Sequence, residues 1–112
     1  MAVVYIPQEP RKRDPKTGRW MQAYDLSPAK KFGDLKVLLP HGSLPIDTEP
    51  MISTLQDSLK DFSDDDYLLA IGNPTAMVMA GIIASQNNEK LKMLYWDSKV
   101  KDYISVEFTM DK

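Results

Sequence analysis

Two short polar segments each follow an apolar run, and their residue types are suited to holding a small anion. "PHGS" (40–43) comes after "DLKVLL", and "GNPT" (72–75) comes after "YLLAI". Backbone N–H groups at a helix start bind phosphate or carboxylate groups, and imidazole, hydroxyl and amide side chains add further donors. The candidate ligand-binding residues are His41, Gly42, Ser43, Gly72, Asn73 and Thr75.

The second of these segments also has a purely structural interpretation. Asn followed by Pro is a common way to begin a helix, with Asn73 as the capping residue and Pro74 at the first helical position. Pro74 also lacks the N–H group that an anion would use. The segment matches neither the Gly-rich dinucleotide-binding pattern nor a P-loop, so both interpretations stay open at this point.

A second candidate surface lies in the basic N-terminal third. Residues 1–36 carry eight Lys or Arg against four Asp or Glu, whereas residues 37–112 carry six against twelve. Basic residues beside an aromatic ring are typical of single-strand nucleic-acid binding, and a basic patch also attracts acidic protein surfaces. The alternative is a solvated basic loop. The candidate nucleic-acid or partner residues are Arg11, Lys12, Arg13, Lys16, Arg19 and Trp20.

The remaining polar residues offer little for catalysis or metal binding. The absence of cysteine excludes a disulfide scaffold, cysteine-ligated zinc and thiol catalysis. His41 beside Ser43 would need an orienting carboxylate and an oxyanion hole, and the sequence identifies neither. The triple Asp at 64–66 suits Mg²⁺ by residue type, but it precedes its strand and is interpreted as a solvated acidic turn. We therefore expect no catalytic set, no metal and no cofactor.

Hydrophobic patterns predict the elements that position the two polar segments. Residues 34–40 and 67–72 are expected to be parallel strands buried on both faces. Residues 50–62 show one apolar helical face, and residues 75–86 form a helical pattern that is apolar nearly all round. Ligands sit beyond the carboxyl ends of parallel strands, so the two polar segments are expected to be spatial neighbours.

Alternating patterns at both ends of the chain predict hairpins. Residues 3–7 and 20–25 are expected to pair around the turn "DPKTG", which makes 1–26 a hairpin with a basic tip. Residues 90–96 and 103–110 are expected to form a terminal antiparallel hairpin. Its aromatic residues are interpreted mainly as sheet packing, with those on the outer face forming a sticky surface.

The order of these elements predicts a small three-layer α/β domain with a partly parallel central sheet: a β-hairpin, then β-α-β-α-β, then the terminal hairpin. Residues 1–112 are long enough for one core. The run from 76 to 84 is too short to cross a membrane, and no signal peptide is recognised, so we expect a cytoplasmic protein. The apolar surface of helix 75–86 predicts a homodimer.

Several stretches of the chain resemble a known group of proteins. These stretches are "FGDLKVLLP", "DYLLAIGNPTAM" and "LKMLYWDSKVKDYISVEF", together with the turn "DPKTGRW" and the segment "YDLSPAKKFG". They resemble small accessory proteins of tailed bacteriophages, including those of cyanophages and marine phages. The resemblance implies an accessory protein that acts in the host cytoplasm, and it transfers no active-site residue.

The favoured function is therefore a non-enzymatic one, in which the protein binds a host or phage protein. One alternative is a small-ligand or nucleotide-binding protein that uses the strand ends at 40–43 and 72–75. A second alternative is single-stranded nucleic-acid binding through the basic N-terminal loop.

Overall fold

The computed structural model describes residues 2–42, 44, 47–86 and 88–109. Five strands form a mixed sheet in the order β4-β1-β5-β6-β7, and two further strands form a separate hairpin. The elements are, in chain order, β1 (Val3–Gln8), β2 (Arg11–Arg13), β3 (Trp20–Gln22), the 3-10 helix η1 (Ser27–Phe32), β4 (Asp34–Leu39), α1 (Glu49–Ser58), β5 (Tyr67–Leu69), α2 (Pro74–Ser85), β6 (Lys90–Asp97) and β7 (Asp102–Thr109).

Strand β1 runs through the interior of the sheet. It pairs in parallel with β4 on one side and with β5 on the other, so that Val4 lies opposite both Leu35 and Tyr67. Strand β6 continues the parallel order, and β7 closes the sheet as its antiparallel edge. The α/β class, the partly parallel sheet and the terminal hairpin predicted from the sequence are confirmed.

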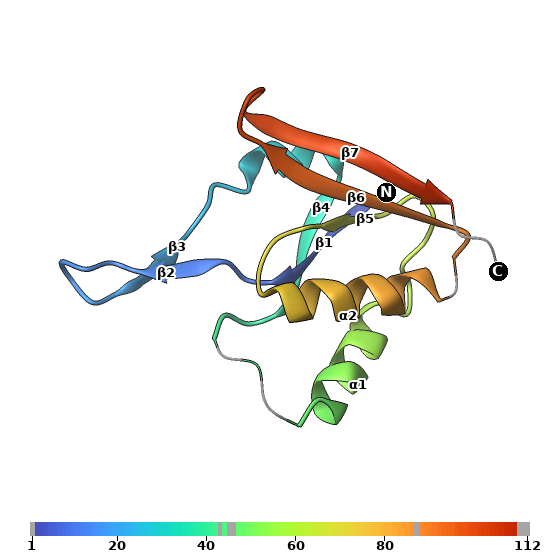
Figure 1. Cartoon of the computed structure of the whole chain (residues 1–112), viewed down its shortest axis with the longest axis horizontal. Helices are drawn as coiled ribbons and strands as arrows, with labels where there is room; N and C mark the ends of the chain where they lie inside the picture. The colour runs from blue at the N-terminus through green and yellow to red at the C-terminus, as the bar shows by residue number, and fades with distance from the viewer. Residues whose placement is uncertain (1, 43, 45–46, 87, 110–112) are drawn as a thin grey trace.

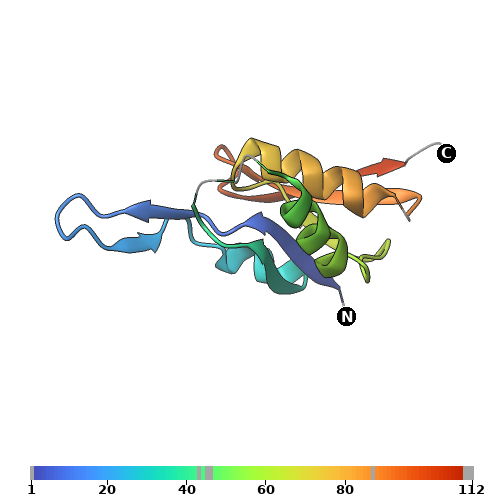
Figure 2. The same ribbon diagram turned by 90° about the horizontal axis from the view of Figure 1, so that it is seen from below.

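The predicted pairing of residues 3–7 with residues 20–25 is wrong. Residues from Val4 to Gln8 are all buried, as expected of a strand inside a parallel sheet rather than one arm of a half-exposed hairpin. The short strand β2 pairs with β3 instead. Figures 1 and 2 show this two-stranded ribbon projecting from the body of the molecule, and we call residues 11–22 the arm.

Helices α1 and α2 cover one face of the sheet. Helix α2 begins as predicted, because the Asn73 side chain accepts a hydrogen bond of 2.8 Å from the Thr75 backbone N–H. It packs on the sheet through Ala76, Ala80 and Ala84, whose small side chains allow a close approach. Their spacing of four residues places these alanines on one helical face.

The opposite face of the sheet is covered by η1, which completes the three layers (Figure 2). Side chains of β1 alternate between the two cores, so that Tyr5 packs with the helices while Val4 and Ile6 pack with η1. An ion pair between Lys31 of η1 and Asp102 of β7 fastens this layer to the edge of the sheet.

Part of the surface of α2 remains uncovered. Val78 is 61% exposed and Ile82 is 56% exposed, so neither the arm nor α1 covers this side of the helix. Among the described residues, no helix combines the length and the apolar character needed to cross a membrane.

The triple Asp at 64–66 is only partly the solvated turn that the sequence predicted. Asp64 and Asp65 are exposed, but Asp66 is 5% exposed. Its carboxylate accepts hydrogen bonds from the backbone N–H of Val3 at 2.9 Å and of Ser63 at 2.8 Å. The prediction is wrong for Asp66, because this side chain satisfies one backbone donor at the start of β1 and one in the turn before β5.

Candidate functional site

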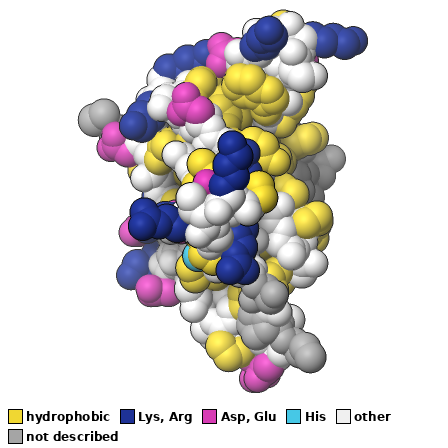
Figure 3. All heavy atoms as spheres, turned by 90° about the vertical axis from the view of Figure 1, so that its left-hand side faces the viewer, with side chains coloured by type: hydrophobic (Ala, Val, Ile, Leu, Met, Phe, Trp, Pro, Cys, Tyr) yellow, Lys and Arg dark blue, Asp and Glu magenta, His cyan; other side chains and the backbone are white. Residues whose placement is uncertain are grey.

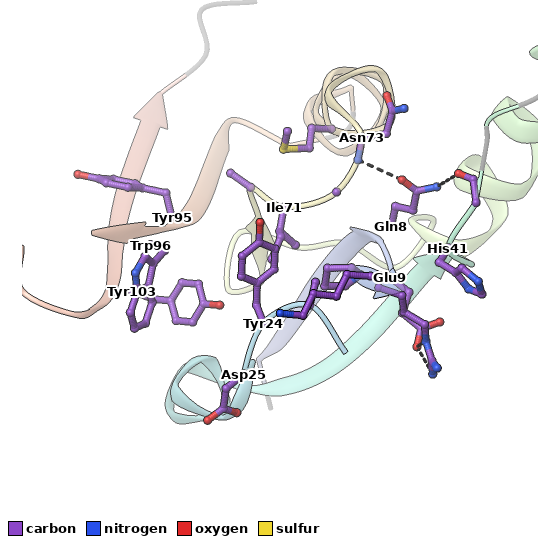
Figure 4. A pocket seen from close by; sticks show the side chains of 18 of the residues that line it. Gln8, Glu9, Tyr24, Asp25, His41, Ile71, Asn73, Tyr95, Trp96 and Tyr103 are labelled. Carbon is purple, nitrogen blue, oxygen red and sulfur yellow. Dashed lines mark hydrogen bonds and ion pairs between the residues drawn. The ribbon is translucent and has the colours of Figure 1, made fainter. Parts of the chain in front are cut away.

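The carboxyl ends of three parallel strands are joined by the side chain of Gln8, which is 6% exposed. Its Nε2 donates to the backbone oxygens of Pro40 at 3.2 Å and of Gly42 at 2.8 Å. Its Oε1 accepts a hydrogen bond of 3.0 Å from the Asn73 backbone N–H (Figure 4). The two predicted polar segments therefore converge, but the end of β1 lies between them.

Gly72 permits the close approach of these strand ends. Its φ of +104° is a conformation that favours glycine. A Cβ atom at this position would lie 2.9 Å from the Cβ of Gln8, closer than such atoms normally approach. Gly72 therefore has a packing reason to be glycine, independent of any ligand.

Two of the N–H groups that an anion would use are engaged within the protein. The N–H of Asn73 bonds to Gln8, and the N–H of Thr75 bonds to the Asn73 side chain. Pro74 has no N–H to offer. Ser43, the remaining hydroxyl of the predicted set, lies outside the described residues. Anion binding by these segments stays a prediction.

A broad surface groove of about 1450 Å³ lies beside the joined strand ends. One wall includes Arg11, Lys12 and Trp20 at the root of the arm. The other is the tip region of the β6–β7 hairpin, with Tyr95, Trp96 and Tyr103 (Figure 4). Four aromatic side chains that line the groove are substantially exposed, namely Trp20 at 53%, Tyr24 at 60%, Tyr95 at 40% and Trp96 at 47%. His41, Gly42, Gly72 and Asn73 also line it.

A contact between two aromatic rings connects the arm to the strand ends. The ring centroids of Trp20 and His41 are 4.8 Å apart, with their planes at 53°. The sequence places Trp20 in the predicted basic surface and His41 in the predicted ligand-binding segments, and the structure brings the two together. The two candidate sites are therefore neighbouring parts of one surface.

The arm presents its basic side chains to solvent. Arg11 pairs with Glu9 at 2.6 Å, and the Arg13 Nε donates to the Gly18 oxygen at 3.1 Å. Lys16 and Arg19 lie near the tip and form no ion pair within the described residues. Figure 3 shows Lys and Arg side chains intermixed with hydrophobic ones on the face from which the arm projects.

A family model for the Phage Pam3 gp32-like protein matches residues 2–110 of the chain. The chain belongs to the Phage Pam3 gp32-like protein family. This membership confirms the resemblance to accessory proteins of phages. No curated protein and no solved structure was found to match the chain.

Several groove residues of this phage protein were not identified from its sequence. Gln8 and Tyr24 were missed, and Trp96 was interpreted as sheet packing. Trp96 does pack on Tyr103, with ring centroids 5.2 Å apart and planes at 74°. Burial raises the pKa of the Tyr103 phenol, and the Asp25 carboxylate adds to the increase. Gln8 could have been recognised as a candidate because it is a polar residue that directly follows the apolar run at 2–7.

The described residues contain no cluster of three or more His, Asp or Glu side chains that could hold a metal ion. The imidazole of His41 contacts the Trp20 ring instead.

Proposed function

We propose that this phage accessory protein is a non-enzymatic binding protein that docks a host or phage protein in the groove at the root of the arm, in the host cytoplasm. The observation that carries the proposal is the exposure of Trp20, Tyr24 and Trp96 around one groove. Tyr and Trp are enriched at protein interfaces, where they supply much of the binding free energy.

Contacts that hold several groove residues in place support the same function. The Trp96 ring is held against Tyr103, the Trp20 ring lies against His41, and Gln8 fixes the strand ends beneath them. A surface that is already ordered loses little conformational entropy when a partner binds.

A capture experiment with matched variants tests this function. Tagged protein is exposed to lysate from phage-infected cells, and the retained proteins are identified by mass spectrometry. The groove variant carries Trp20→Ala and Tyr24→Ala. The control variant carries Val37→Ala and Phe108→Ala, which remove exposed apolar side chains that do not line the groove.

The expected result is a partner that the wild-type protein and the control variant retain and that the groove variant retains about tenfold less. Capture that is equal for all three proteins, or no specific capture at all, contradicts the proposal. Circular dichroism of the two variants checks that both remain folded.

The rival function is binding of a nucleotide or another small phosphate compound. It is favoured by one observation, namely that His41, Gly42 and Asn73 line the same groove. A thermal-shift screen against nucleotides and sugar phosphates tests it. A stabilising ligand whose effect is abolished by Asn73→Ala and weakened by His41→Ala would support the rival function.

A further inference from the structure

We infer that the segment bound in the groove is acidic: an extended stretch in which Asp or Glu residues stand a few positions from an apolar or aromatic anchor residue. This inference rests on the proposed function and specifies the chemistry of its partner. It follows from the distribution of charge along the arm and from the position of Trp20.

The charge of the protein is divided between the arm and the body. The arm carries five Lys or Arg against a single Asp, a net charge of +4. Because the whole chain has a net charge of −2, the rest of the molecule carries −6. An acidic partner segment is attracted to the arm, whereas the body repels it, and this difference orients the segment along the arm.

The positive charge at the tip is not neutralised within the arm. The Asp14 carboxylate accepts hydrogen bonds from the Lys16 backbone N–H at 2.9 Å and the Thr17 hydroxyl at 3.1 Å. These bonds lower the pKa of Asp14, with the Lys16 N–H as the largest cause, and they commit the carboxylate to forming the turn. The side chains of Lys16 and Arg19 therefore remain available to a partner.

The strand pairing in the arm places its basic side chains next to Trp20, the residue that would contact the anchor of a bound segment. Arg13 lies opposite Trp20 in the β2–β3 pairing, so the two side chains share one face of the ribbon. The ring of Trp20 in turn contacts His41 at the groove. Trp20 begins β3 at the end of the β2–β3 ladder nearest the turn, and Lys16 lies within that turn. The basic side chains of the tip therefore lie only a few residues from Trp20, which for a bound extended segment corresponds to about three positions between its anchor and its acidic residues.

An acidic protein segment fits this surface better than a nucleic acid does. The carboxylates of Glu9 and Asp25 line the groove, and the body beyond it is acidic. A nucleic acid carries a negative charge at every phosphate and would bring some of these charges against the groove carboxylates. A protein segment can confine its carboxylates to the arm and place an uncharged anchor in the groove.

Fluorescence anisotropy with the full-length protein and labelled peptides tests the inference. One probe has a central Trp and Glu residues about three positions away on one side. A second probe replaces each Glu with Gln, and a third probe is an oligodeoxythymidine. We expect the Glu peptide to bind about tenfold more tightly than the Gln peptide, with an affinity that falls as salt is added.

Charge reversal on the arm provides the matched variants. Lys16→Glu with Arg19→Glu is expected to weaken binding of the Glu peptide about tenfold. Lys60→Glu with Lys90→Glu makes the same change in net charge on the body and is expected to leave it unchanged. Equal binding of the Glu and Gln peptides, absence of binding, or tighter binding of the oligodeoxythymidine each overturns the inference.

The same variants separate this inference from the function on which it rests. One outcome is a partner captured from infected cells that is lost by the Trp20→Ala and Tyr24→Ala variant but kept by the Lys16→Glu and Arg19→Glu variant. In that case the groove binds a protein, but acidic residues of that protein do not contribute to its recognition. If both variants keep the partner, the groove is not the docking site.

Discussion

The side-chain oxygen of Gln8 accepts a hydrogen bond of 3.0 Å from the backbone N–H of Asn73, the residue that caps α2. The amide nitrogen of the same side chain donates to Pro40 and Gly42 in the loop after β4. One buried carboxamide on β1 thus holds the ends of both neighbouring strands.

Gln8→Ala is expected to lower the free energy of unfolding by about 2–3 kcal/mol, because it leaves the Asn73 N–H and two loop carbonyls without their partner. Urea denaturation measures the change. The matched control is Gln22→Ala on the exposed arm, which we expect to change stability by less than about 0.5 kcal/mol. A Gln8 variant as stable as this control would show that water replaces the lost bonds at no cost.

Gly72→Ala is expected to destabilise the protein more than Gly42→Ala. Both glycines have positive φ, +104° at Gly72 and +126° at Gly42, so both substitutions strain the backbone. Only at Gly72 would the new Cβ also meet Gln8, whereas at Gly42 it would meet nothing within 4 Å. The difference between the melting temperatures of the two variants measures the cost of the contact between the new Cβ at position 72 and Gln8. Equal melting temperatures would argue against this contact.

Asp66→Ala is expected to cost about 2–3 kcal/mol of stability, since it removes the acceptor for the N–H groups of Val3 and Ser63. The neighbouring exposed Asp64 supplies the control, and Asp64→Ala should be nearly neutral. Chemical denaturation compares the two variants. Similar losses for both would mean that the acidic turn acts only through its net charge.

Lys31→Ala is expected to raise the pKa of Asp102 toward the ordinary carboxyl value. In the native protein the hydrogen bond from Lys31 lowers this pKa, and the Tyr103 N–H lowers it further. A carboxyl group with a lowered native pKa contributes stability above its unfolded pKa, and this contribution is lost as the pH falls below about 4 toward the native value. Titration of the Asp102 carboxyl carbon by NMR checks the direction, and an unchanged pKa would contradict it.

We propose that the protein forms a homodimer through the exposed side of α2, where Val78 and Ile82 lie. Light scattering is expected to give about twice the chain mass of 12.7 kDa. Val78→Asp with Ile82→Asp should yield a folded monomer. A wild-type protein with the mass of a single chain would exclude this dimer.

Local signals in the sequence predicted α2 well. The Asn-Pro pair at 73–74 specified the cap and the first helical residue, and apolar residues over 75–86 specified the helix itself. These features depend on neighbours within one or two turns, so they can be recognised without knowledge of the rest of the fold.

The position of β1 could not be predicted in the same way. Its apolar run identified a strand, but the choice between β3 and the pair β4 and β5 as partners depends on contacts distant in sequence. The role of Gln8 depends in turn on that choice, because its partners Pro40, Gly42 and Asn73 come from two other segments. The contact of Trp20 with His41 could not be predicted either, because these two residues are also distant in sequence.

The interior position of β1 also constrains the order of events in folding. Both of its partners, β4 and β5, are synthesised later, and Val4 can pair with Tyr67 only after β4 and α1 have been made. Until β5 has been made, β1 is an apolar segment with at least one unpaired edge, which favours non-native association of the nascent chain. Release of the chain before β5 emerges would therefore yield fragments that aggregate, even where their arm sequence is intact.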